Sequence, residues 1–396
     1  MADLDRRFRS LDRTASPDLW PDIEAREPQS QPPSRGRQVA VAAVALAVAA
    51  GGVALAVRAF LGGEPTPRTT AEPAATPAAP VEPVVDMTLP IKFPASIVYG
   101  EGSVWVAASA NDGTAAGTVY RIDPDTAEIL AEIQSPVVPG WETGGGAMEV
   151  AEGNVWVAGG GSSSDLVRID AGTNRVTAEF EVAGSFLGDV AVDDRGVWVS
   201  VFGRDEGGDQ RIFLVRLDPR TGEEEARIPM ESSYAREVLA VEGTLWLHER
   251  RTHGSIVAGS DLTRIDPGTG RIMASVPVPG GATMLTDGGG FIWAATWTSE
   301  DGNLLVRVDP HTGAVVRYPS EPLEFVIDVG EGGVWGVARR GQDLFEGRGG
   351  IVRFDPVTGQ VDTGVEVDAG TIALAVAPGS VWTIAEGVTR IELRPA

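Results

Sequence analysis

The residues best suited to acid–base chemistry in this chain are the adjacent pair His248 and Glu249, with His253 five positions further on. Histidine titrates near neutral pH, and a glutamate beside it can orient the ring or share a divalent cation with it. Such a pair could act as a general acid and base or hold a metal ion. However, His248 extends a predicted strand, where packing alone explains it, and His253 lies beside a glycine in a predicted loop. These three residues are therefore candidates without a defined catalytic set.

The other patterns that could bind a ligand lack the spacing that their chemistry requires. Asp287 precedes three glycines, and the run from Glu300 to Asn303 is acidic, but neither has the ligand spacing of a calcium loop. No phosphate-binding loop, nucleophile elbow or dinucleotide fingerprint is present. The chain has no cysteine and therefore no thiol nucleophile or thiolate ligand. We expect no cofactor and no metal, with a divalent cation at the His–Glu pair as the alternative.

Two repeated phrases define the elements that must position these residues. The first reads V-W-V-A or close to it, and the second, R-x-D-P-x-T-G, follows it in each copy, with a decayed version in the last. Successive tryptophans of the first phrase lie 51, 42, 48, 47, 42 and 47 residues apart, a period typical of β-propeller blades. The tryptophans are Trp105, Trp156, Trp198, Trp246, Trp293, Trp335 and Trp382, and the aspartates of the second phrase are Asp123, Asp170, Asp218, Asp266, Asp309 and Asp355.

Each repeat is long enough for four short strands. In the third repeat we expect strands at 189–192, 197–201, 212–217 and 225–229, separated by turn residues. The last repeat has only three predicted strands, and residues 84–91 supply a fourth, which closes the ring and covers an exposed edge. The sequence thus predicts an all-β, seven-bladed β-propeller of four-stranded blades closed by an N-terminal strand. An open solenoid is the competing architecture, and it would not need matching fragments at both ends.

The repeated residues have structural explanations. The aspartate can accept backbone hydrogen bonds from its turn, the proline presets the next φ angle, and the glycine takes the left-handed position. The tryptophan lies on one face of its strand, where it can pack between neighbouring blades. We therefore assign the repeated tryptophans, arginines and aspartates to the scaffold, because each repeat must bury its own core.

An uncharged segment precedes the predicted propeller. The 20 residues from Gln38 to Val57 carry no charge, and Phe60 and Leu61 extend the apolar stretch. At ~1.5 Å per residue, this length matches the ~30 Å hydrocarbon core of a bilayer. A cleaved signal peptide and a soluble alanine-rich helix are the alternatives, but the long leader and long apolar run are unusual for a signal peptide. We expect residues 38–61 to form a single transmembrane helix.

Arginines on either side of this helix predict its orientation. Seven precede it, and only Arg58 and Arg68 follow it closely, so the positive-inside rule places residues 1–37 in the cytoplasm. Residues 62–84, rich in proline, alanine and threonine, form a linker, and residues 85–396 form the propeller outside the cell. The segment 1–37 has apolar residues at helical spacing. An amphipathic helix that lies on the membrane or docks on a cytoplasmic partner and a disordered tail fit it equally well.

Loop lengths distinguish the two faces of the predicted propeller. Turns between first and second strands are short, whereas second-to-third and fourth-to-first connections vary in length and emerge on the same face. Variable loops on a rigid scaffold commonly carry binding residues, so we expect a protein or small-molecule partner on this long-loop face. The candidate binding residues are Trp141, Glu142, Tyr234, Arg236, His253, Trp297 and Phe345.

The repeat resembles the YVTN-type propellers and the related virginiamycin B lyase-like propellers. The matching residues are V-W-V-A, R-I-D-P-x-T-G-x-V and an I-x-V strand, as from Arg264 to Val276, and the resemblance extends over residues 85–396. The lyase branch implies an enzyme that opens a cyclic depsipeptide antibiotic with histidines, a glutamate and a magnesium ion near the central channel. Those lyases have W-F-T-E in successive repeats, whereas valine and alanine follow Trp105 and Trp156. Only His248 and Glu249 could take the catalytic places.

The net charge of the chain limits the classes of partner that it can bind. The chain has 32 basic and 56 acidic residues and a net charge of −24, which opposes binding to nucleic acid and tolerates cations or basic proteins. The sequence favours a non-enzymatic, membrane-anchored, extracytoplasmic propeller that binds or senses a protein, glycan or small ligand. The alternatives are a metal-assisted lyase or hydrolase related to virginiamycin B lyase, and a structural scaffold of an envelope complex.

Overall fold

The computed structural model describes residues 79–396, except for 111–115, 139–147, 161–164, 206, 231–234, 254–255, 299–301, 320–322, 340–348, 357–359, 362–363 and 369. The predicted cytoplasmic segment 1–37, the predicted transmembrane helix 38–61 and most of the predicted linker therefore lie outside the described residues. Within the described part of the chain, no helix combines the length and the hydrophobicity that a membrane span requires.

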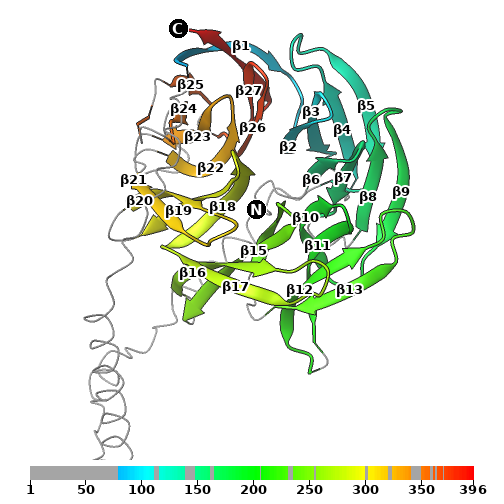
Figure 1. Cartoon of the computed structure of the whole chain (residues 1–396). Coiled ribbons are helices and arrows are strands. Elements are labelled where there is room, and N and C mark those ends of the chain that lie inside the picture. The colour runs from blue at the N-terminus through cyan, green and yellow to red at the C-terminus, as the bar shows by residue number, and fades with distance from the viewer. Residues whose placement is uncertain are drawn as a thin grey trace, which may run out of the picture. The chain divides into compact units, whose positions relative to one another are not determined.

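Seven antiparallel four-stranded sheets are arranged around a common axis, which confirms the predicted seven-bladed propeller (Figure 1). Blade 1 contains β2 (Pro94–Gly100), β3 (Ser103–Ser109), β4 (Gly117–Ile122) and β5 (Ile129–Ser135); blade 2 contains β6 (Met148–Ala151), β7 (Asn154–Ala158), β8 (Asp165–Asp170) and β9 (Arg175–Glu181). Blade 3 contains β10 (Phe186–Asp193), β11 (Gly196–Arg204), β12 (Gln210–Leu217) and β13 (Glu224–Pro229); blade 4 contains β14 (Ala235–Val241), β15 (Thr244–His253), β16 (Ile256–Ile265) and β17 (Ile272–Val278). Blade 5 contains β18 (Gly281–Gly288), β19 (Phe291–Thr298), β20 (Gly302–Val308) and β21 (Val315–Pro319); blade 6 contains β22 (Leu323–Gly330), β23 (Gly333–Arg339), β24 (Gly349–Phe354) and β25 (Val365–Val367). Blade 7 contains β26 (Ala373–Ala377), β27 (Ser380–Ile384), β28 (Val388–Pro395) and β1 (Val81–Leu89).

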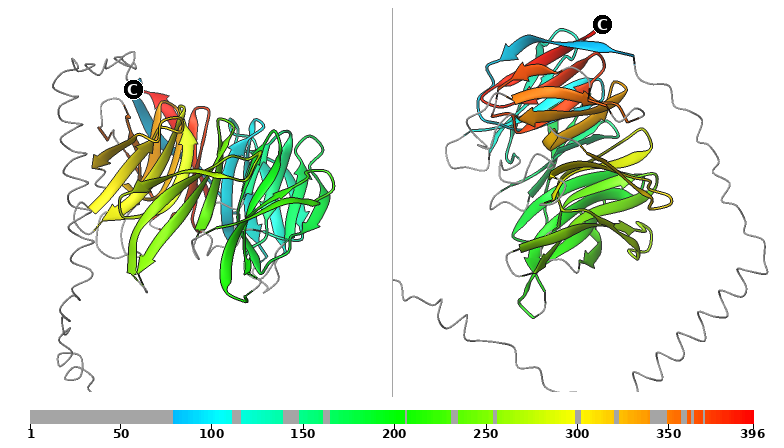
Figure 2. Two further views of the ribbon diagram at one scale, coloured as in Figure 1. Left: turned by 60° about the horizontal axis from the view of Figure 1, so that its bottom comes forward. Right: turned by 90° about the vertical axis from the view of Figure 1, so that its left-hand side faces the viewer.

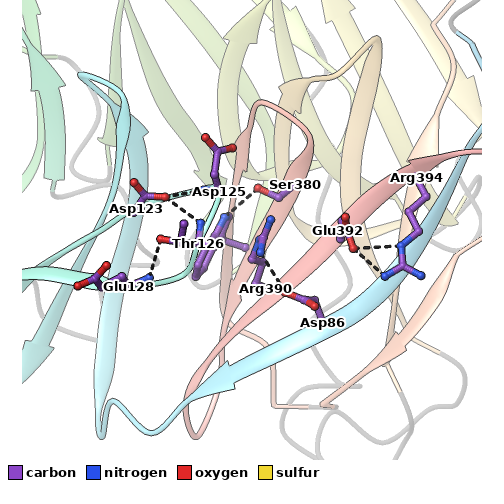
Figure 3. A network of polar contacts seen from close by, with 10 residues as sticks. Asp86, Asp123, Asp125, Thr126, Glu128, Ser380, Arg390, Glu392 and Arg394 are labelled. Atoms are coloured by element: carbon purple, nitrogen blue, oxygen red, sulfur yellow. Dashed lines mark hydrogen bonds and ion pairs between the residues drawn. The ribbon is translucent and has the colours of Figure 1, made fainter.

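The ring is closed by its N-terminal strand, as the sequence predicts. β1 pairs antiparallel with β28, so residues about 300 positions apart share blade 7. Arg390 donates from Nη1 to Oδ2 of Asp86 at 3.0 Å, close to the turn of blade 1 that follows Asp123 (Figure 3). β1 begins at Val81, inside the stretch assigned to the linker, so the propeller starts four residues before the expected boundary at residue 85.

The core is divided into layers between the blades, and the repeated tryptophans lie in these layers. All seven are at most 2% exposed. Trp105 of blade 1, for example, packs with Val155 and Val157 of blade 2. Successive side chains of a strand point to opposite faces of the sheet. Each blade therefore presents apolar side chains to both of its neighbours, and the tryptophans are buried between the facing surfaces.

The repeated arginines connect neighbouring blades. Arg121 lies over its own blade's Trp105, with Cζ 5.2 Å from the ring centroid, and donates from Nη1 to the carbonyl oxygen of Ala171 in blade 2 at 2.6 Å. Arg216 reaches the carbonyl of Pro267, and Arg264 reaches that of His311, in the same way. Each of these arginines thus stacks on one blade and binds the turn of the next.

The repeated aspartates hold those turns in shape. Oδ1 of Asp218 accepts hydrogen bonds from the backbone N–H groups of Arg220 (2.8 Å) and Thr221 (2.9 Å). Gly222 completes the turn with a φ angle of 72°, which a residue without Cβ adopts freely. The backbone hydrogen bond from Thr221 is the main cause that holds the pKa of Asp218 below its usual value. The second repeated phrase therefore forms a hairpin turn whose backbone carbonyl accepts a hydrogen bond from the repeated arginine of the preceding blade.

Candidate functional site

Five consecutive blades place a carboxyl group on their first strand, the strand nearest the axis of the ring (Figure 1). Figure 2 shows the same ring of blades from two other directions. We call these acidic residues the axial acids: Glu149 on β6, Asp189 on β10, Glu237 on β14, Asp287 on β18 and Asp328 on β22.

Glu149 shows that the axial acids act on one another across the ring. Burial is the main cause that raises its pKa to about 8, and Asp287 and Asp328 raise it further. Glu149 belongs to blade 2, whereas those two aspartates belong to blades 5 and 6, on the opposite side of a seven-membered ring. The first strands of these blades surround the axis, so negative charge on the two aspartates disfavours ionisation of Glu149. At neutral pH, Glu149 is therefore mostly protonated.

Asp328 is held in place by three blades. Oδ2 accepts a hydrogen bond from the N–H of Val376 in blade 7 at 2.8 Å, and Oδ1 accepts from the N–H of Val329 and from Oγ1 of Thr286 in blade 5. Despite these hydrogen bonds, burial raises the pKa of Asp328 to about 6. Its side chain therefore clamps the inner strands and also adds negative charge near the axis.

Asp189 makes the equivalent clamp between blades 3 and 4. Oδ2 accepts a hydrogen bond from the N–H of Val238 at 3.0 Å, while its own N–H donates to Oγ of Ser200 at 2.9 Å. Its other oxygen, Oδ1, is buried and has no hydrogen-bond partner among the described residues. Burial raises the pKa of Asp189 well above its usual value, and the neighbouring carboxyls of Glu237 and Glu149 raise it as well. Asp287 is the most exposed axial acid, yet partial burial still raises its pKa.

The fifth axial acid, Glu237, binds His248. Its Oε2 lies 2.5 Å from Nδ1 of the imidazole, and Nε2 lies 3.0 Å from Oγ of Ser260. A carboxylate, an imidazole and a hydroxyl in this order also form the catalytic triad of serine hydrolases. Here, however, Ser260 is fully buried, and His248 is 2% exposed, so no substrate can reach the hydroxyl in this conformation. The chain of hydrogen bonds fixes β14, β15 and β16 to one another.

The structure separates the two residues that the sequence places side by side. Glu249 follows His248 on β15, and successive residues of a strand point to opposite faces. Glu249 accordingly accepts a hydrogen bond from Oγ1 of Thr263, while His248 faces Glu237. His311 lies in the turn after Asp309, where its Nε2 contacts Oε2 of Glu242 and both side chains are exposed. Among the described residues, no group of three histidine, aspartate or glutamate side chains has the geometry to hold a metal ion.

Most of the binding residues predicted on the long-loop face lie outside the described residues. This applies to Trp141, Glu142, Tyr234 and Phe345. The backbone of Arg236 belongs to β14 and that of His253 to β15, but their side chains lie outside the description. Trp297 is described: it lies near the end of β19, paired with Gly281 and Asn303, and is 51% exposed.

Sequence reasoning missed four of the five axial acids and noticed Asp287 only for its glycines. The signal was available in the spacing from each repeated tryptophan. Glu149 and Asp328 both lie seven residues before their tryptophan, and Asp189 and Glu237 both lie nine residues before theirs. Because these residues occur in only some repeats, they do not belong to the scaffold consensus. An acidic residue on an inner strand, where apolar packing is expected, is the informative exception.

Comparisons with known proteins identify the fold. No family model matches the sequence, and no curated protein matches it either. Among solved structures, a chain of the hydrazine synthase of Kuenenia stuttgartiensis is similar, with a TM-score of 0.58 and 16% identity over 78% of this chain and 98% of that one. The Pan2 WD40 domain of Neurospora crassa is also similar, with a TM-score of 0.55 and 11% identity over 77% of this chain and 90% of that one. These identities are too low to transfer a function, so the similarity shows the propeller fold alone.

Proposed function

We propose that this protein is a membrane-anchored, extracytoplasmic binding module whose axial acids recognise a cationic group of the ligand. Residues 38–61 would anchor it, and the propeller would face the outside of the cell. The observation that carries the proposal is that Glu149, Asp287 and Asp328 lie on first strands around one axis, and that the two aspartates add to the burial that raises the pKa of Glu149 to about 8.

A cationic ligand would relieve the electrostatic cost that the axial acids impose on the fold. Buried carboxyl groups are tolerated when they are protonated or paired with a cation. Glu149 already holds a proton at neutral pH because of its burial and, to a smaller extent, the charges of Asp287 and Asp328. An ammonium or guanidinium group that displaces this proton would interact with several carboxylates at once.

The enzymatic alternative has less support. The YVTN-type repeat motifs resemble those of virginiamycin B lyase-like propellers, but the residues proposed for catalysis do not meet in one site. His248 and Glu249 point to opposite faces of β15, and the hydroxyl that His248 contacts is buried. A scaffold role in an envelope complex is compatible with the fold and is a special case of binding, because a scaffold also needs a recognition surface.

Isothermal titration of the full-length protein with spermidine at pH 9 and low salt tests the proposal. Glu149→Gln should weaken the binding at least ten-fold. Glu132→Gln, an exposed residue on β5, removes the same charge and should change the affinity less than two-fold. Equal weakening by both variants would show a general effect of net charge and would refute an axial site, as would a lack of binding.

A further inference from the structure

The outermost strand of each blade has one free edge. In all seven sheets this strand pairs with a single neighbour among the described strands, so its outward backbone groups have no partner strand there. Such an edge can pair with another extended chain, and proteins commonly prevent this with charged side chains. Most outer strands of this propeller contain an exposed charged residue, namely Asp86 on β1, Glu132 on β5, Glu179 on β9, Glu224 on β13, Arg317 on β21 and Glu366 on β25.

β17 of blade 4 is the exception among the described outer strands. Its sequence, I-M-A-S-V-P-V, contains no charged residue. Ile272 is 45% exposed and Met273 is 52% exposed. Ser275 occupies the place, nine residues after the turn aspartate, that Glu132 and Glu179 take in blades 1 and 2. The outer edge of blade 4 is therefore apolar at the positions where other blades have a charge.

The register of β17 shows which of its backbone groups face outward. Pro277 is opposite Asp261 of β16 and has no N–H to donate to it. Within a sheet, a proline takes a position where its nitrogen faces the free edge. Backbone groups of an antiparallel strand alternate in direction from one residue to the next. The N–H and C=O groups of Ser275, two residues before Pro277, therefore point away from β16 as well.

A second copy of this chain is the partner that fits an uncharged edge. A basic partner would gain most at the edges with acidic residues, such as those of β5 and β9, because opposite charges favour association. A second copy has the same net charge of −24, so like charges oppose its approach at those edges. Two copies that meet at β17 place no charged side chains of this strand opposite each other.

Antiparallel pairing of β17 with itself is compatible with two-fold symmetry. With Ser275 of both copies on the symmetry axis, the two residues exchange N–H···O=C hydrogen bonds. Ala274 then lies opposite Val276 of the second copy, and such apolar cross-strand pairs stabilise a sheet. β17 has seven residues, compared with ~20–30 residues a side in a standard interface, so the dimer should be weak.

We propose that two copies of this protein associate by antiparallel pairing of β17, which joins their fourth blades into one continuous sheet. This inference goes beyond the proposed function and does not depend on the axial acids. The proposed membrane anchor would confine the copies to one surface, and the higher effective concentration there would favour a weak dimer.

Disulfide trapping tests the pairing directly, because the chain contains no cysteine. The variant Ser275→Cys is prepared as the full-length protein in proteoliposomes and oxidised with copper phenanthroline. The proposed register places the two Cα atoms ~5.5 Å apart, within the ~4.4–6.8 Å that a disulfide requires, so we expect a dimer on a non-reducing gel. Glu132→Cys, at the same place on β5, is the matched control and should give about one-fifth as much dimer or less.

Two further variants test the register and the edge. Pro277→Cys would place its two Cα atoms ~14 Å apart, because four residues separate them along the strands at ~3.4 Å each, so it should form no more dimer than Glu132→Cys. Met273→Lys, added to Ser275→Cys, should reduce the dimer to about one-fifth. Val176→Lys, at an exposed apolar residue of β9, should leave the Ser275→Cys dimer unchanged, and thermal melting should show that both lysine variants are folded.

Four outcomes would overturn the proposal. Equal trapping at residues 275 and 132 would indicate random collision in the membrane. Trapping at residue 277 without trapping at 275 would contradict the two-fold pairing. A dimer that Met273→Lys does not reduce would form elsewhere on the surface. If Ser275→Cys gives no dimer in proteoliposomes but crosslinks to another protein in cells, the edge of blade 4 belongs to a different partner.

Discussion

Glu149 is predicted to make the fold less stable as the pH rises. Its pKa is about 8 in the folded protein, mainly because of burial, compared with 4.5 when the group is not perturbed. Between these two pH values, the folded chain carries a proton that the unfolded chain has lost. The folded state then binds more protons than the unfolded state, so the free energy of unfolding decreases with increasing pH. Above about pH 8 this decrease ends, because both states are ionised.

The size of the effect follows from the same pKa values. Each pH unit within the interval changes stability by ~1.36 kcal/mol, which gives an upper limit of ~5 kcal/mol between pH 4.5 and about 8. Glu149 is only partly exposed, but water entry and local relaxation reduce such costs in proteins. We therefore expect ~2 kcal/mol between pH 5 and pH 8. The Glu149→Gln variant cannot ionise and should be more stable than the wild type at pH 8 by about this amount.

Urea denaturation at pH 5, 6, 7 and 8, followed by tryptophan fluorescence, measures this difference. The quantity of interest is the free energy of unfolding of the variant minus that of the wild type at each pH. Glu132→Gln on the exposed surface of β5 provides the control and should show no trend. A difference for Glu149→Gln that is constant with pH, or that decreases toward pH 8, would refute the assignment of a raised pKa to this carboxyl.

Three other predictions concern the scaffold. Asp328→Ala removes the acceptor for the N–H groups of Val329 and Val376 and should lower the free energy of unfolding by ~2–4 kcal/mol. Asp328→Asn keeps an acceptor and should lower it less. Equal losses in urea denaturation would contradict a role for these hydrogen bonds. Trp198→Ala leaves a cavity between blades and should cost ~3–5 kcal/mol, and Trp297→Ala, which removes an exposed side chain, should cost less than ~1 kcal/mol in the same assay. Asp86→Ala removes the partner of Arg390 at the ring closure and should cost ~1 kcal/mol at low salt; a cost that does not diminish in 1 M salt would argue against an ion pair.

The architecture was predictable because every blade repeats the same four-strand pattern with the same tryptophan and turn phrases. The tryptophan phrase, the turn phrase and the missing fourth strand of the last repeat each follow from local chemistry, and the pairing of β1 with β28 agrees with them. The role of the repeated arginines was only partly predictable. Their position on the scaffold follows from repetition, but the contact of Arg121 with Ala171 in the next blade depends on how blades are rotated against one another.

The candidate site was harder to predict from the sequence because its residues come from different repeats. Glu149, Asp287 and Asp328 lie far apart in the chain and meet only because a seven-membered ring brings their strands to one axis. The sequence drew attention to His248 and Glu249 because they are adjacent, although adjacency in a strand separates side chains. In the structure, His248 instead forms a hydrogen bond with Glu237, which lies on the first strand of the same blade. Searching each repeat for polar residues at apolar positions would have found the axial acids.

Proton release during cation binding tests the central claim most directly. Spermidine is titrated into the full-length protein at pH 7 in two buffers of different ionisation enthalpy, and the difference in heat gives the number of protons released. Glu149 is mostly protonated at this pH, so binding at the axis should release up to about one proton, and the Glu149→Gln variant should release none. Binding without proton release, or the same release from both proteins, would contradict a cation site among the axial acids.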